Sequence, residues 1–319
     1  MTTLFLSTWT VVHVVVPPEA SQFYSERSAA CVAFFFAPEL GAVKSIAGLL
    51  RSRALQKSLR LVEGWESCSL KQAFLVIMKG LYLGEGSGSV KADKLIELAR
   101  SGRLHFVDFP TDAQINARSK TDWLAKAIAL SQTVWFAANI LSRLAGKYQI
   151  TPFEVLTTAY VCCGQFMAIC WFRCPQDLQE KFTVKLREED GDGPNEDDPS
   201  KLCVKGMSYS MAHVAFVICQ TIFLSIHLAA WNYPFPTIAE TWLWRAVSFA
   251  TWILGTGYGC LVSLYRGSPV PPFLSGTIIS LYTACRLAVL ALALAALRQS
   301  PAGVYDRPSW GAYWGHIGA

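Results

Sequence analysis

The stretch TIISLYTACRLAVLALALAAL, residues 277–297, decides the fold class of this 319-residue chain. It contains no acidic side chain and one basic side chain, Arg286. A helix needs about 20 mostly apolar residues to cross the hydrocarbon core of a bilayer. This segment is therefore predicted to be a transmembrane helix, and the remainder of the chain is expected to be adapted to the same environment.

The composition of the whole chain agrees with this prediction. Hydrophobic residues make up 52% of it and charged residues 16%, with a mean hydropathy of +0.31, whereas about a quarter of the residues of soluble domains are charged. The net charge of +5 is small, and no basic block gathers the Lys and Arg residues into a surface that would follow phosphates. We therefore expect the lipid bilayer to be a partner and nucleic acid not to be one.

Other apolar segments have the length of a span. Four of them have only occasional polar positions: residues 123–144, 152–172, 208–231 and 241–264. Residues 29–50 are also long enough but include Pro38, Glu39 and Lys44, so they form either a span packed inside a bundle or a tilted interfacial helix. Residues 3–16 are short for a span, and whether they form a full one is left open. The predicted fold is all-α, a polytopic bundle of about 6–7 spans with short interfacial helices.

Two of the predicted helices begin with a recognisable cap. Thr151-Pro152-Phe153-Glu154 and Thr237-Ile238-Ala239-Glu240 both place Thr three residues before Glu. In a capping box the two side chains each accept a hydrogen bond from the other residue's backbone N–H. We therefore interpret Glu154 and Glu240 as helix caps and not as catalytic carboxylates.

The predicted domain organisation follows the spans and the basic residues. Residues 51–122 and 173–207 hold 12 and 6 Lys and Arg residues, which places both loops in the cytosol. Within the first loop, residues 70–83 and 92–100 are expected to form helices lying along the membrane surface. The predicted parts are two membrane segments in 1–50, a cytosolic loop in 51–122, a five-span bundle in 123–298 interrupted by the acidic linker 173–207, and an extramembrane tail in 299–319.

Charged side chains inside spans are candidate functional residues, because each costs about 2.5–3.5 kcal/mol to insert. Asp122 and Lys126 are four residues apart at the mouth of a span and are expected to pair with each other. Glu39 and Arg286 lie near the centres of their segments and cannot reach an interface. We predict that they pair inside the bundle.

Two histidines, His213 and His227, lie on nearly one face of the segment 208–231. Fourteen residues separate them, or about 21 Å along a helix, so they cannot share a ligand. Each is expected to make a hydrogen bond within the bundle, although an intramembrane histidine is a candidate site by default. No metal-ligand spacing accompanies them, and neither a metal nor a cofactor is predicted.

A family resemblance covers most of the chain. The stretches 8–17 (TWTVVHVVVP), 36–49 (FAPELGAVKSIAGL), 115–177, 226–245 and 281–317 resemble a large family of fungal multispanning membrane proteins whose function is uncharacterised. The resemblance implies a multi-pass membrane fold and a membrane location, without distinguishing the plasma membrane from endomembranes. It implies no activity.

Three classes of function remain open, and the sequence does not decide whether the protein is an enzyme. A non-catalytic protein that senses, scaffolds or binds a lipid or small apolar ligand fits the long loops and the absence of catalytic motifs. A transporter or channel-like protein fits the buried charges and the glycines of Gly255-Thr256-Gly257-Tyr258-Gly259, which could interrupt a helix or simply allow close packing. A membrane-embedded enzyme acting on a lipid or terpenoid is the third class.

Overall fold

The computed structural model describes residues 16, 22–84, 88–119, 123–178, 180–186, 209–265 and 268–306. The chain divides into two compact units, which are described separately: residues 1–10, 124–165 and 213–319 form the first, and residues 11–123 and 166–212 the second. The predicted segment 3–16, apart from Val16, lies outside the described residues, as do most of the acidic linker and the end of the tail.

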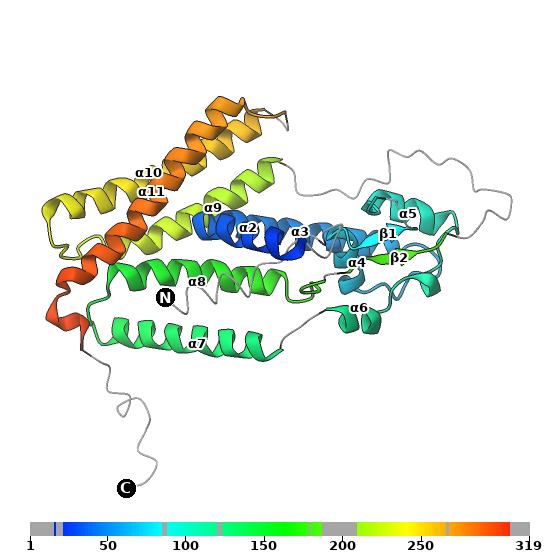
Figure 1. The fold of residues 1–319 in the computed structure, drawn as a ribbon, viewed down its shortest axis with the longest axis horizontal. Helices are drawn as coiled ribbons and strands as arrows, with labels where there is room; N and C mark the ends of the chain where they lie inside the picture. The colour runs from blue at the N-terminus through cyan, green and yellow to red at the C-terminus, as the bar shows by residue number, and fades with distance from the viewer. Residues whose placement is uncertain are drawn as a thin grey trace, which may run out of the picture. The chain divides into compact units, whose positions relative to one another are not determined.

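The first unit is built from long helices (Figure 1). These are α7 (Trp123–Ala145), α8 (Pro152–Cys170, whose last turn belongs to the second unit), α9 (Tyr209–Leu228), α10 (Ile238–Leu264) and α11 (Pro272–Ala295), followed by the short 3-10 helices η4 (Ala296–Gln299) and η5 (Ala302–Val304). The five long helices coincide with the five segments predicted in 123–298, with ends that differ by a few residues. Both predicted capping boxes are present, at Thr151 and Glu154 and at Thr237 and Glu240.

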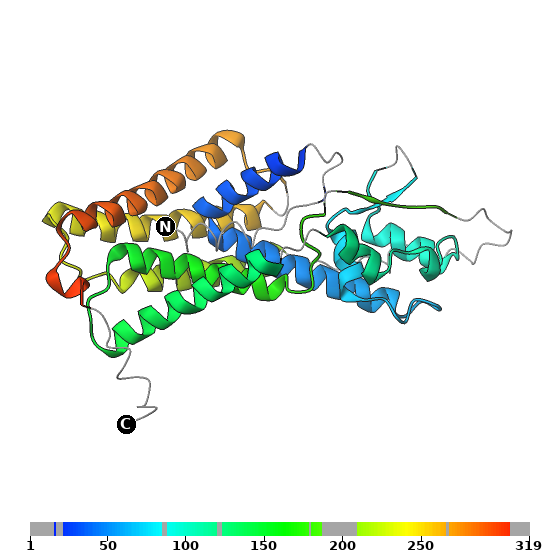
Figure 2. The ribbon, with the colours of Figure 1, turned by 60° about the horizontal axis from the view of Figure 1, so that its bottom comes forward.

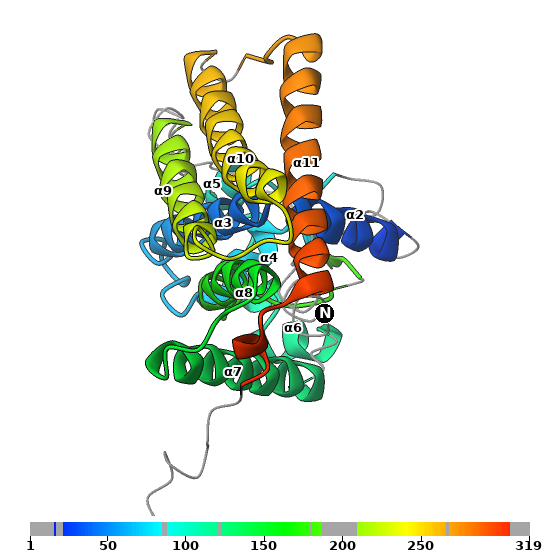
Figure 3. The ribbon, with the colours of Figure 1, turned by 90° about the vertical axis from the view of Figure 1, so that its left-hand side faces the viewer.

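Successive helices of this unit run in opposite directions. The Arg143 guanidinium at the end of α7 lies 3.9 Å from Glu154 at the start of α8 and donates a hydrogen bond to the carbonyl of Val304. Arg298, just after α11, pairs with Glu240 at the start of α10. Figure 3 shows α10 and α11 packed together, with α9 beside α10. The unit is therefore an up-and-down bundle in which these four helix ends lie at one end.

The second unit contains shorter elements. They are α2 (Phe23–Phe36), α3 (Pro38–Leu59), α4 (Leu70–Ile77), β1 (Leu81–Leu83), α5 (Ala92–Arg100), η2 (Phe106–Asp108), α6 (Asp112–Arg118) and β2 (Phe182–Val184). The second half of α3, α4 to α6 and the two strands enclose a small hydrophobic core, which we call the α3–α6 domain. Its members have relative exposures of at most 2%: Leu55, Leu59, Trp65, Phe74, Leu75, Leu81, Leu95, Ile96, Leu98, Leu104, Phe109 and Ile115.

The structure shortens the first of the two helices that were predicted to be interfacial. The segment 70–83 is not one helix but α4 followed by β1, and α4 has eight residues, about 12 Å, which is too short to cross a bilayer. The helix predicted at 92–100 is present as α5. Most apolar side chains of both helices are buried within the protein, where both helices contact α3. Their position along a membrane surface stays a prediction.

The two strands join parts of the chain that were predicted to be separate loops. β1 and β2 pair in parallel, with Leu81 opposite Phe182 and Leu83 opposite Val184. Arg118 at the end of α6 donates a hydrogen bond to the carbonyl of Lys181, next to β2. The segment 173–207 is therefore not a linker throughout, since its first part completes the α3–α6 domain.

The predicted segment 29–50 is not a single helix. It is divided at Ala37 into α2 and α3, and the chain direction turns by 117° between them (Figure 2). Pro38 is the cause: it has no N–H to donate to the preceding turn, so it begins α3. The helical region is also sterically disfavoured for the residue before a proline, and Ala37 has φ −140° and ψ 69°.

Among the described residues, four helices are long and apolar enough to cross a membrane: Pro152–Cys170, Met211–Leu228, Ile238–Leu264 and Pro272–Gln299. The bent pair of α2 and α3 would make a fifth if it is a broken span. The structure is thus mostly helical, as predicted. The predicted number of 6–7 spans exceeds the four or five that the described residues supply.

Candidate functional site

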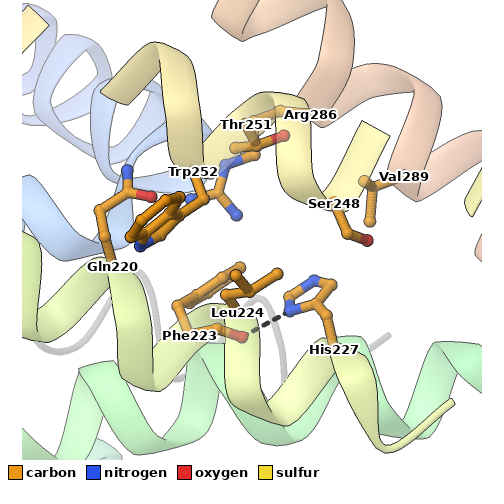
Figure 4. Close-up of a pocket in the computed structure, with 9 residues that line it drawn as sticks. All are labelled: Gln220, Phe223, Leu224, His227, Ser248, Thr251, Trp252, Arg286 and Val289. Carbon is orange, nitrogen blue, oxygen red and sulfur yellow. Dashed lines mark hydrogen bonds between the residues drawn. The ribbon is translucent and has the colours of Figure 1, made fainter. Parts of the chain in front are cut away.

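Polar side chains gather in the first unit, where α9, α10 and α11 meet (Figure 4). Gln220 and His227 from α9 and Arg286 from α11 are only 2%, 3% and 6% exposed. Ser248 and Thr251 from α10 are also buried, and their hydroxyls donate to carbonyls one turn earlier in the same helix. Three helices with apolar outer faces thus share a polar interior, which we call the α9–α11 cluster.

Arg286 is held by aromatic side chains. Its Nε and Nη2 donate hydrogen bonds of 3.0 and 2.8 Å to the hydroxyl oxygen of Tyr282, one turn earlier in α11. Its guanidinium carbon lies 4.1 Å from the centre of the Phe223 ring of α9, a cation–π contact. The Gln220 amide reaches the same Tyr282 hydroxyl at 3.4 Å. One tyrosine oxygen therefore links α9 to the arginine of α11.

The His227 ring is stacked between two aromatic rings, and one of its nitrogens has no hydrogen-bond partner among the described residues. Its ring centre lies 4.5 Å from that of Phe223 and 5.8 Å from that of Trp244. Nδ1 is 2.8 Å from the Phe223 carbonyl, so it carries the proton and donates it. Nε2 is then an acceptor, and no described group donates to it. Figure 4 shows this nitrogen turned towards the cavity inside the cluster.

The cavity in the cluster is small. Its volume is about 10 Å³, and its lining includes Gln220, His227, Ser248 and Arg286. A site needs roughly 10–15 Å³ of such volume to hold one water molecule. In this conformation the cluster has room for about one water molecule and none for a metabolite or a lipid chain. Such a water would donate a hydrogen bond to His227 Nε2.

The glycines of α10 pack against α9 and do not break the helix. A methyl group at Gly255 would collide with the Gln220 amide, and one at Gly259 would approach His213 Nδ1 to 2.5 Å. A methyl group at Gly257 would meet nothing within 4 Å. Because α10 continues to Leu264, the glycines release no backbone carbonyls. They serve the close helix packing that was one of the two predicted readings.

The predicted site residues do not form one site. His227 and Arg286 line the same cavity, whereas His213 lies four turns earlier in α9, where its Nε2 is 3.5 Å from Cys260 Sγ. Glu39 is fully buried at the start of α3 in the second unit. Its pairing with Arg286 stays a prediction, because the two residues belong to different units.

The other predicted pair cannot be assessed. Asp122 lies outside the described residues, and so does the side chain of Lys126. Sequence reasoning missed Gln220 and Tyr282, which connect the cluster. The available signal was weak: both are uncharged polar residues in otherwise apolar segments.

A second hollow lies in the α3–α6 domain, between α6 and β2. It has a volume of about 310 Å³, at the lower end for small-molecule pockets. Its wall contains two charged residues, Asp108 and Arg118. The Arg118 guanidinium is already engaged, since it donates a hydrogen bond to the Lys181 carbonyl and stacks on the Phe182 ring at 4.3 Å. Within the described part of the chain, no three His, Cys, Asp or Glu residues are grouped so as to hold a metal ion.

Comparisons with known proteins give a family and no activity. No curated protein and no solved structure matches the chain. Residues 1–194, which include the whole α3–α6 domain and the helices α7 and α8, match a family of unknown function, and the chain therefore belongs to that family, DUF8562.

Proposed function

We propose that this chain is a multi-pass integral membrane protein without catalytic activity, which senses, scaffolds or binds lipid. The observation that carries the proposal is the distribution of side chains in α9, α10 and α11. Isoleucines such as Ile218 and Ile253 are 54% and 60% exposed, while Gln220, His227 and Arg286 are buried. Such a surface would be unfavourable in water but suits lipid tails.

The pairing of β1 with β2 supports the number of crossings. Because the strands belong to one small domain, the chain between residues 83 and 182 must cross the membrane an even number of times. α8 is apolar and long enough to cross, and α7, with 23 residues, is the other long helix in that interval. If α8 crosses, α7 crosses as well. With α9, α10 and α11 this gives the five-span bundle predicted for residues 123–298.

The same geometry favours a non-catalytic role over transport. A transporter needs a path that a solute can occupy, and the α9–α11 cluster has room for about one water molecule. The unbroken α10 removes the specific argument for transport that the glycine-rich stretch offered. We therefore prefer a closed bundle that carries the α3–α6 domain at the cytosolic face, in a multispanning family of the fungal type that the sequence resembles.

Reconstitution of the full chain into liposomes tests this proposal. We expect the purified protein to resist extraction by alkaline carbonate, to retain bound phospholipid in native mass spectrometry, and to leave the ion conductance of planar bilayers unchanged. Release from membranes by carbonate would contradict the membrane assignment. Conductance that disappears in Gln220→Leu, while a surface change such as Val107→Ala leaves it intact, would replace the proposal with a channel that uses the cluster.

A further inference from the structure

The helices α2 and α3 form a V-shaped hairpin in the second unit (Figure 2). The 117° turn at Ala37 directs α2 back along α3. Gly41, near the turn, permits this packing: a methyl group there would lie 2.6 Å from Met167 Sδ of α8 and 3.1 Å from the Phe34 ring of α2. The tip of the hairpin is thus fixed against the last turns of α8.

Contacts with the end of α8 give the depth of the hairpin. Ser45 of α3 lies beside the Cys170 thiol, and a methyl group added at Gly48 would lie 3.5 Å from the indole nitrogen of Trp171. Trp171 directly follows α8, where an indole ring is expected at the membrane interface. Pro38 lies seven residues before Ser45, or about 10 Å further along the helix axis. The tip therefore reaches about a third of the way into a 30 Å hydrocarbon core.

Both ends of the hairpin lie on the side where α8 ends. At the start of α2, Arg27 is buried and forms a 2.6 Å ion pair with Asp177, seven residues after α8. At the far end of α3, Leu55 and Leu59 are fully buried in the core of the α3–α6 domain. A span would have its two ends on opposite sides of the membrane, and this hairpin has both on one side.

The polarity of the exposed side chains changes along the hairpin in agreement with this depth. Near the tip, Val32 and Leu40 are 57% and 53% exposed, as side chains facing lipid would be. At the start of α2 the exposed residues are Tyr24, Ser25 and Glu26. The surface is thus apolar at the tip and polar at the end.

We propose that α2 and α3 form a re-entrant hairpin that inserts into the cytosolic leaflet and contacts its acyl chains, and that it does not cross the membrane. This inference rests on the proposed membrane location and replaces the predicted second span. The number of crossings preceding the α3–α6 domain then falls by one.

Labelling of single cysteine variants of the full chain with a membrane-impermeant maleimide, in sealed and in perforated vesicles, tests the hairpin. Mass spectrometry locates the label, so native cysteines need no replacement. We expect Tyr24→Cys, Lys57→Cys and Val107→Cys to react from one side and Asn232→Cys only from the other. Leu40→Cys should react only with a lipid-soluble maleimide.

Each contrary outcome has one meaning. Labelling of Tyr24→Cys from the Asn232 side would restore a crossing span and overturn the proposal. Labelling of Leu40→Cys by the impermeant reagent would place the tip in water and also overturn it; Leu61→Cys, a matched exposed leucine in the α3–α6 domain, shows that the reagent reaches that side. If Val107→Cys and Asn232→Cys react from the same side, the five-span arrangement fails instead.

Discussion

The α3–α6 domain and the α9–α11 cluster distribute their side chains in opposite ways. In the domain, apolar residues such as Trp65 and Leu75 are enclosed and charged residues are outside. In the cluster, a histidine, a glutamine and an arginine are enclosed, and only 17% of the apolar window of α9 is buried. The first pattern is typical of a protein core formed in water, and the second is compatible with a surrounding apolar medium. The two parts of the chain therefore bury side chains of opposite polarity. This contrast is the strongest physical indication of the environment of each part.

The largest expected effect is in the domain. Trp65 packs edge-on against Phe106 and Phe109, with ring centres 5.4 and 5.2 Å away, so Trp65→Ala should lower the local stability by about 3–5 kcal/mol. Hydrogen exchange of the full chain measures this as lost protection in α4 and α5. The exposed Val107→Ala should change nothing. If Trp65→Ala left α4 protected, the domain would not be held by a water-driven core.

Cys68 reports on the same core independently. Burial raises the pKa of its thiol to about 11, although the Arg60 charge opposes this shift. Because the thiolate is the reactive form, Cys68 should be alkylated very slowly at pH 8 while the domain is closed. Trp65→Ala should accelerate its alkylation, measured on the peptide that carries Cys68. Equal rates in both proteins would contradict the burial of Cys68.

The next largest effect is expected in the α9–α11 cluster, from the removal of a buried polar group. Tyr282→Phe removes the oxygen that accepts two hydrogen bonds from Arg286, and loss of a bond to a buried charged group costs about 1.5–3 kcal/mol. The thermal unfolding of the full chain in nanodiscs should show the loss. Tyr258→Phe on α10 is the matched control and should be silent. A silent Tyr282→Phe would mean that the polar interior contributes nothing to packing.

A smaller effect should distinguish the glycines of α10. Gly259→Ala pushes a methyl group into His213, and overpacking of this kind costs about 1–3 kcal/mol. Gly257→Ala, two residues away, meets open space and should be neutral or slightly stabilising. The difference in unfolding midpoint between the two variants is the measurement. Equal midpoints would show that α9 and α10 do not rely on close approach.

The smallest effect should come from the ion pair between Arg298 and Glu240. Arg298 is exposed, and exposed pairs contribute about 0–1 kcal/mol. Arg298→Ala should therefore shift the midpoint less than Thr237→Ala, which removes the cap of α10 at a cost of about 1 kcal/mol. If Arg298→Ala shifted the midpoint more than Thr237→Ala did, that end of the bundle would lie in a less aqueous environment than the α3–α6 domain.

The sequence predicted the long helices because a run of about 20 apolar residues and a Thr-to-Glu cap are local signals, as in α8 and α10. It did not predict the turn at Pro38, because a proline is tolerated inside some spans and only the contacts of Arg27 and Gly41 show that the chain folds back. Nor could it predict β1 and β2. Three-residue strands carry no periodicity, and their partners are about 100 residues apart.

The candidate site shows the same limit. Arg286 and His227 were named individually, because a charge or an imidazole in an apolar segment is conspicuous. Their meeting depends on the rotation of α9 against α11, which no local pattern contains. Gln220 and Tyr282 carry neither a charge nor a motif, and yet they connect the two helices.

The parallel pairing of β1 with β2 also sets the order of events during synthesis. About 100 residues separate the strands, and at 5–20 residues per second the ribosome needs roughly 5–20 s to produce them. During that interval α4 and α5 have been synthesised, but the core of their domain still lacks β2. The core of the nascent α3–α6 domain therefore stays incomplete until Phe182 emerges, and a pause in translation before β2 would prolong its vulnerability to proteolysis.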